Sequence, residues 1–179
     1  MKKFFVSLII FLSAFVAAVG AMAAPLSESQ YSTLKAVALA DQTAAGYIAN
    51  GNDIQLADWF NAQQTWTVWR PALTPALARA AIISAATQLD SLTVGKRDSL
   101  FYLVSGDLNP ADVAVRTGID DLCGSQNSLK SALRAAMKRQ ATRAEKALST
   151  GTGSDASPAT LTWDGFISGY DAQNIRNAP

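Results

Sequence analysis

The stretch Thr65-Trp66-Thr67-Val68-Trp69-Arg70, followed by Pro71, decides the fold class. Its residues are aromatic and β-branched, as is typical of strands, and the proline ends the run. It predicts a short strand near 65–70 in a chain whose other apolar residues recur mostly at helical spacing. Because a few short strands are not stable alone in water, this strand must pack on helices. The predicted fold is mainly α, a compact bundle of short helices with a small two- or three-stranded β element.

Cap residues divide the rest of the chain into short helices. Ser27-x-x-Gln30 and Thr142-x-x-Glu145 are capping boxes, and Thr74-Pro75 and Asn109-Pro110 each place a proline in the first turn after a cap. Asp41 and Asp53 are also cap residues, and Asn50-Gly51 is a typical helix end. The predicted helices cover approximately residues 27–40, 41–50, 53–60, 74–89, 93–104, 109–123, 127–139 and 142–148.

The C-terminal part has a different composition. Residues 149–160 are almost all Gly, Ser, Thr, Asp, Pro and Ala, which cannot build a core and predict an exposed loop. Leu161-Thr162-Trp163 is an extended pattern that can pair with the strand near 65–70, and Tyr170 to Arg176 predicts a last helical turn. The predicted organisation is a single domain with one core: a helical part over 24–148, the loop over 149–160, and a C-terminal β element and tail over 161–179.

Composition excludes several classes of function. The chain has no histidine, so Ser-His and Cys-His nucleophiles and histidine metal sites are excluded. Lys plus Arg is 15 against 14 for Asp plus Glu, and this balance gives no general attraction for nucleic acid. In the only adjacent acidic pair, Asp120-Asp121, the expected partner of Asp120 is Arg116, four residues upstream. We therefore predict a protein that is not an enzyme, with no catalytic residues, cofactor or metal.

Cys123 is the only cysteine, so the chain has no intrachain disulfide. A small buried hydrophobic residue is the expected role, with an intermolecular bridge as the alternative.

Candidate partner contacts lie in a basic run. Lys130, Arg134 and Lys138 are spaced to share one face of the helix predicted over 127–139. Such a stripe suits phosphates or an acidic partner surface, and the alternative is an ordinary solvated face. Trp66 and Trp69 point to opposite faces of a strand, so one of them is expected at a contact surface unless both pack in the core. The candidate contacts are Lys130, Arg134, Lys138, Arg139, Arg143 and Trp69.

The N-terminus has the pattern of a secretory signal peptide. Lys2 and Lys3 precede an uncharged apolar run from Phe4 to Gly20, and Ala21-Met22-Ala23 is a small-x-small site. The pattern predicts a signal peptide over 1–23, cleavage between Ala23 and Ala24, a periplasmic or secreted protein and no membrane span in the mature form. A retained anchor is one alternative. In another, Met22 is the true start codon and the protein belongs to the virion or the host cytoplasm.

Several short motifs resemble a family of small, poorly characterised proteins of tailed bacteriophages and prophages. They occur in order between about Leu34 and Asp171 and are most distinct at Lys138-Arg139-Gln140-Ala141-Thr142-Arg143-Ala144-Glu145-Lys146, Thr150-Gly151-Thr152-Gly153 and Ser157-Pro158-Ala159-Thr160. The resemblance implies a viral origin and a role in particle structure or assembly, and it implies no catalytic or ligand residues. Such proteins begin close to the first helix, where Met22 lies.

Two functions follow as hypotheses. One is a non-enzymatic virion structural or assembly component that contacts copies of itself or other virion subunits. The other is an exported periplasmic binding or regulatory protein, of the lysis or superinfection type, with a cleaved signal peptide.

Overall fold

The computed structural model describes residues 24–179, so the predicted signal peptide and the alternative start at Met22 lie outside the described residues. The prediction of a mainly helical fold with a small β element is confirmed. The helices are α1 Glu28–Leu39, α2 Gln42–Asn50, α3 Asp53–Asn61, α4 Pro75–Ser84, α5 Ala86–Leu89, α6 Val94–Leu103, α7 Val113–Cys123, α8 Asn127–Ala136, α9 Arg143–Ala147 and α10 Gly169–Asn177. The strands are β1 Gln63–Trp69, β2 Lys138–Thr142, β3 Ser149–Thr150 and β4 Thr160–Leu161.

Most of the predicted helix starts are confirmed. Both capping boxes form, at the start of α1 and of α9, and Asp41 accepts hydrogen bonds from the first turn of α2. Gly51 ends α2 with φ of 67°, a conformation that glycine adopts without steric cost. Local cap chemistry therefore determines these ends.

Two predicted caps are wrong. Asn52, not Asp53, is the N-cap of α3, and the Asp53 carboxylate instead accepts hydrogen bonds from Arg176 in α10. Asn109 accepts from Ala111 N in a turn, and α7 begins later, capped by Asp112. In the first case, a long-range ion pair has replaced the local cap.

The helix predicted over 127–139 is also wrong at its end. It stops at Ala136, and Lys138–Thr142 is the strand β2, paired antiparallel with β1 at Trp69↔Lys138 and Val68↔Arg139. A strand partner that lies far away in sequence decides this segment. Lys138 consequently does not share a helical face with Lys130 and Arg134.

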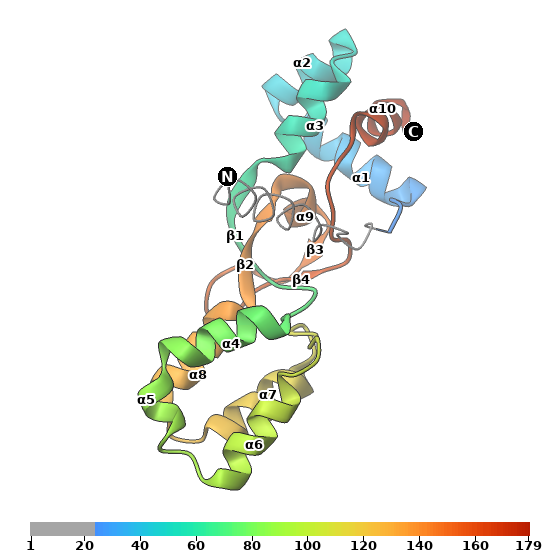
Figure 1. Cartoon of the computed structure of the whole chain (residues 1–179). Coiled ribbons are helices and arrows are strands. Elements are labelled where there is room, and N and C mark those ends of the chain that lie inside the picture. The colour runs from blue at the N-terminus through green and yellow to red at the C-terminus, as the bar shows by residue number, and fades with distance from the viewer. Residues whose placement is uncertain (1–23) are drawn as a thin grey trace, which may run out of the picture.

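The helices form two groups joined by the β strands (Figure 1). The first group contains α1, α2, α3, α9 and α10, and its core includes Leu34, Phe60 and Ile175. The second contains α4 to α8, and its core includes Leu100 and Leu133. The sequence predicted one core, whereas the described residues form two large hydrophobic clusters and a small third one at the strands. Strand β1 leads from the first group to the second, and β2 leads back.

The loop predicted over 149–160 is mostly exposed, but Gly153, Pro158 and Ala159 are buried. Its ends pair as β3 and β4, and Ala159 lies beside β1, where its N donates to Thr67 O (2.9 Å) and its O accepts from Trp69 N (3.0 Å). Gly153 O also accepts from Thr67 N (2.7 Å). The segment satisfies backbone groups of β1 that β2 does not reach, which is why residues without apolar bulk are ordered there. Most of 149–160 is therefore an exposed loop, as predicted, but the pairing of its ends and its attachment to β1 were not predicted.

None of the helices within 24–179 has the length and apolar character needed to cross a bilayer.

Candidate functional site

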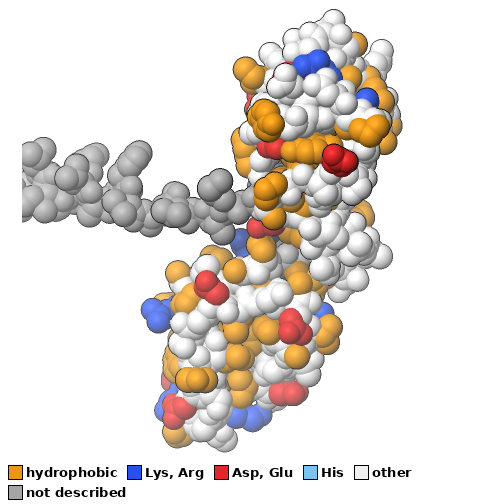
Figure 2. All heavy atoms as spheres, turned by 90° about the vertical axis from the view of Figure 1, so that its right-hand side faces the viewer, with side chains coloured by type: hydrophobic (Ala, Val, Ile, Leu, Met, Phe, Trp, Pro, Cys, Tyr) orange, Lys and Arg blue, Asp and Glu red, His pale blue; other side chains and the backbone are white. Residues whose placement is uncertain are grey.

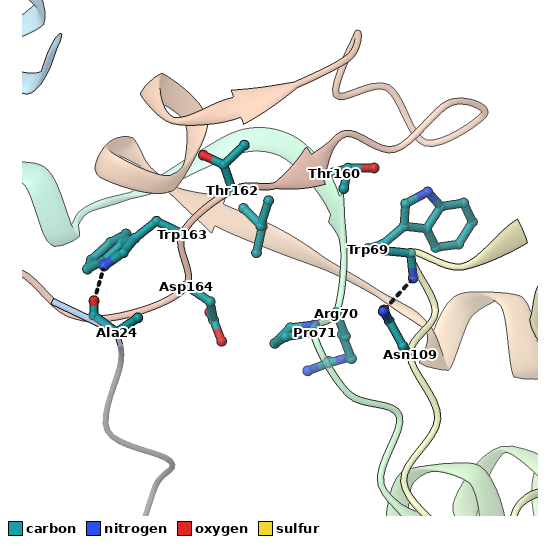
Figure 3. Close-up of a pocket in the computed structure, with 11 residues that line it drawn as sticks. Ala24, Trp69, Arg70, Pro71, Asn109, Thr160, Thr162, Trp163 and Asp164 are labelled. Carbon is teal, nitrogen blue, oxygen red and sulfur yellow. Dashed lines mark hydrogen bonds between the residues drawn. The ribbon is translucent and has the colours of Figure 1, made fainter. Parts of the chain in front are cut away.

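A pocket of about 480 Å³ lies where the two helix groups and the strands meet. Residues 69–71 at the end of β1 and residues 160–164 line it. Figure 3 shows Thr162, Trp163 and Asp164 on one side, and Trp69, Arg70 and Pro71 on the other. Asn109, from the turn before α7, completes one wall. Three segments that are distant in sequence therefore contribute to this pocket.

Ala24 also lines the pocket. Its carbonyl oxygen accepts a hydrogen bond from Trp163 Nε1 (2.9 Å), as the dashed line in Figure 3 shows. The predicted cleavage between Ala23 and Ala24 falls directly beside this contact and stays a prediction.

An arginine with two carboxylates supports the pocket. Arg139 donates through Nη1 and Nη2 to both oxygens of Glu145 (2.7 and 2.6 Å), and Nη2 also donates to Asp164 Oδ1 (2.5 Å). Glu145 is 2% exposed and also accepts from Thr142 N (2.8 Å) as part of the capping box of α9. This triad ties β2, α9 and the pocket wall together.

The two carboxyl groups titrate differently. Burial opposes ionisation of Glu145, but hydrogen bonds from Arg139 and Thr142 outweigh it and hold its pKa below the usual value. Burial raises the pKa of Asp164, and the neighbouring Glu145 raises it further, while Arg139 acts in the opposite direction.

Arg70 differs from the other arginines near the pocket. Its backbone N donates to Met137 O (2.8 Å), whereas its side-chain Nε is buried and has no hydrogen-bond partner in the structure described. Burial, followed by repulsion from Arg139, lowers the pKa of Arg70.

Trp69 packs against cations from the second helix group. The guanidinium of Arg116 lies 4.5 Å from its ring centroid and that of Arg134 lies 5.9 Å away. Asp120 pairs with Arg134 (2.5 Å), so the predicted pairing of Asp120 with Arg116 is wrong. Arg116 instead donates to the carbonyl oxygens of Pro110 and Ala111, which lie within reach because α7 begins late.

The other candidate contacts are dispersed. Lys130 lies on α8, Lys138 pairs with Asp155 (2.9 Å), and Arg143 stacks 4.0 Å from the ring centroid of Trp59. Trp66, on the other face of β1, packs against Gly153 and donates from Nε1 to Ser149 Oγ (3.0 Å). Much of the basic run therefore holds the fold together, and the continuous stripe predicted from spacing does not form.

Sequence reasoning missed Arg70, Asn109 and Asp164. In the sequence, Arg70 ends a predicted strand, Asn109 is a predicted helix cap and Asp164 belongs to the C-terminal β element, so no sequence signal indicates that they line one pocket. Cys123 is buried, as predicted, and burial raises the pKa of its thiol. Across residues 24–179, no three side chains of Cys, Asp or Glu gather in a way that could hold a metal ion.

Comparison with known proteins gives no relative: no family model, curated protein or solved structure matches the chain.

Proposed function

We propose that the chain is a non-enzymatic component of a tailed phage or prophage, in the virion or in its assembly, that acts through protein–protein contacts. The phage context rests on the resemblance of the motifs between Lys138 and Thr160. The mode of action rests on the surface of the second helix group.

The observation that carries the proposal is an open hollow of about 600 Å³ between α6 and α7. Tyr102, which is 85% exposed, Leu103 and Leu122 line it, and Phe101 is exposed next to it. Figure 2 shows hydrophobic side chains on the surface of both helix groups. Exposed aromatic residues beside a hollow are typical of protein contact surfaces, because they bury a large area at a small cost in side-chain entropy.

The test is particle association of the protein expressed from its native gene. We expect the wild-type protein to sediment with particles and Tyr102→Ser to lower the bound fraction about tenfold, as loss of an aromatic anchor does. Tyr170→Ser is the matched control, since Tyr170 is 72% exposed on the other helix group, and we expect it to leave association unchanged. Circular dichroism checks that both variants fold.

An equal particle-bound fraction for Tyr102→Ser and wild type would contradict the proposed surface. The leader pattern of residues 1–23 favours the second candidate, an exported periplasmic binding or regulatory protein of the lysis or superinfection type. A mature chain that begins at Ala24 in the periplasm and is absent from particles would favour that candidate. Intact-mass analysis of periplasm and particles separates the two.

A further inference from the structure

The side chain of Arg70 carries a charge that has no partner in the described structure. Its Nε is buried and unpaired, and within residues 24–179 its side chain forms neither a hydrogen bond nor an ion pair. Nearby arginines show the usual arrangement: Arg139 pairs with two carboxylates, and Arg116 donates to two carbonyl oxygens. Arg70 as a whole is only partly buried, so the unsatisfied group is its Nε–H. A buried N–H donor without an acceptor is costly, and a native protein rarely leaves one unpaired unless another molecule supplies the acceptor.

The position of Arg70 suits a binding role. It follows β1 directly, its backbone N is fixed by Met137 O, and it precedes the rigid Pro71. It lines the pocket together with Trp69, whose ring is held by Arg116. The guanidinium is therefore presented from an ordered element, which lowers the entropy lost when a ligand binds.

The opposite side of the pocket defines the rest of the ligand. Asp164 lines it, and one of its oxygens, Oδ1, is held by Arg139, while Oδ2 accepts no hydrogen bond from the described residues. Arg70 and Asp164 form no ion pair with each other, so an acceptor for one and a donor for the other can enter between them.

We infer that this pocket binds a carboxylate of a partner polypeptide, with the Arg70 guanidinium as the fork-shaped donor and Asp164 as acceptor for an N–H group next to that carboxylate. Carboxylate and phosphate can each accept two N–H bonds from arginine, but phosphate carries more negative charge and is repelled more strongly by Asp164, which favours the carboxylate. The volume of about 480 Å³ is in the range of small-ligand sites. The inference deepens the proposed function and rests on it in one respect, namely that the partner is a protein.

The test is a titration of the full chain, monitored by the NMR signals of the Arg70 side-chain Nε–H and the Trp69 indole. The probes are acetyl-trialanine with a free C-terminus, the same peptide amidated, an amidated acetyl-Ala-Asp-Ala, and inorganic phosphate. We expect saturable shifts with a carboxylate peptide and binding at least about tenfold weaker for amidated trialanine, since the charged acceptor is gone. Comparing the peptide that has a free C-terminus with the aspartate peptide shows whether the pocket prefers a C-terminal or a side-chain carboxylate.

Arg70→Met keeps the length of the side chain and removes the unpaired donors. We expect it to lose carboxylate binding while its melting temperature stays equal or rises. The substitution removes a buried donor that had no partner, so no acceptor in the protein loses a hydrogen bond. Arg79→Met, at an exposed arginine of α4, is the matched control and keeps binding. Arg70→Lys retains the charge without the fork, and we expect it to bind at least about tenfold more weakly than wild type.

Absence of a saturable shift with either carboxylate peptide in the wild-type protein would overturn the inference. Equal binding by Arg70→Met would do the same, and phosphate binding tighter than both peptides would point to a different ligand. If Arg70→Met does not fold, the wild-type titration and the binding measured for Arg70→Lys still test the inference. Peptide binding tests the pocket and particle association tests the proposed function, so either can fail alone.

Discussion

At the scale of single residues, charge is used mainly to hold the backbone in place. Arg139 and Glu145 join β2 to the first turn of α9, and Arg143 donates to Trp59 O across to α3. Arg139 and Arg143 come from the basic run that the sequence offered either as a partner surface or as an ordinary solvated face. Among the described arginines near the pocket, Arg70 is the one whose Nε is buried and unpaired.

Glu145→Ala is expected to lower the free energy of unfolding by about 3 kcal/mol, because it leaves Arg139 partly unpaired in a buried site and removes the second half of a capping box. Arg139 keeps Asp164 as a partner, so the effect stays at the lower end of the range for broken buried pairs. Urea unfolding monitored by circular dichroism measures it.

Asp155→Ala is the matched control, because Asp155 also pairs with a cation of β2 but its side chain is 86% exposed. Solvent screening makes such a pair weak, and we expect a change within about 0.5 kcal/mol. Equal losses for the two variants would show that burial does not set the strength of these pairs.

At the scale of elements, β1 is bordered on two sides. Strand β2 pairs with it antiparallel, and Ala159 lies beside it in parallel. On this second side, Gly153 packs against the Trp66 ring, and the backbone φ of Gly153 is 62°. The segment over 149–160 thus owes its order to β1 and not to its own composition.

Gly153→Ala is expected to destabilise the protein by about 2 kcal/mol or more, since a Cβ there is strained at positive φ and crowds the Trp66 ring. The Cβ would lie 2.1 Å from two ring atoms. The midpoint of urea unfolding measures the loss of stability, and tryptophan fluorescence, to which Trp66 contributes, reports the change in packing.

Gly118→Ala provides the comparison within α7, where a Cβ meets nothing within 4 Å. Because alanine has the higher helix propensity, we expect a gain of about 0.5–1 kcal/mol. A Gly153→Ala protein as stable as the wild type would show that the 149–160 segment does not pack against Trp66 in solution.

At the scale of the whole molecule, the chain builds two cores connected by strands. The second helix group is one continuous insertion between β1 and β2, whereas the first combines α1 to α3 with α9 and α10. Among residues 24–179, the buried cluster between the two cores consists of Val68, Ala141 and Ala159, with the partly buried Trp66 and Leu161 packed against it. Because this junction is small, we expect each helix group to unfold locally without the other.

Leu133→Ala and Ile175→Ala test this, because both side chains are fully buried, one in each core. Each is expected to cost about 2–5 kcal/mol, the range for large-to-small core substitutions. By hydrogen exchange, Leu133→Ala should lower protection in α4 to α8, and Ile175→Ala should lower it in α1, α3 and α10. Loss of protection throughout the molecule in both variants would instead mean a single cooperative unit.

By itself, the sequence determined the features that depend on neighbours along the chain. The strand at Thr65 to Arg70, the capping boxes at Ser27 and Thr142 and the helix end at Gly51 were predicted because β-branched composition, caps and glycine act within a few residues. The predicted fold class, mainly α with a small β element, follows from these local signals.

The tertiary structure alone decided what depends on contacts between distant segments. Lys138 to Thr142 forms a strand because β1 supplies backbone hydrogen-bond partners. Asp53 pairs with Arg176 instead of capping α3. The pocket arose in the same way, since it joins Arg70, Asn109 and Asp164 from three segments that are distant in sequence. Local preferences in such segments amount to about 1 kcal/mol or less per residue, so long-range pairing and burial outweigh them.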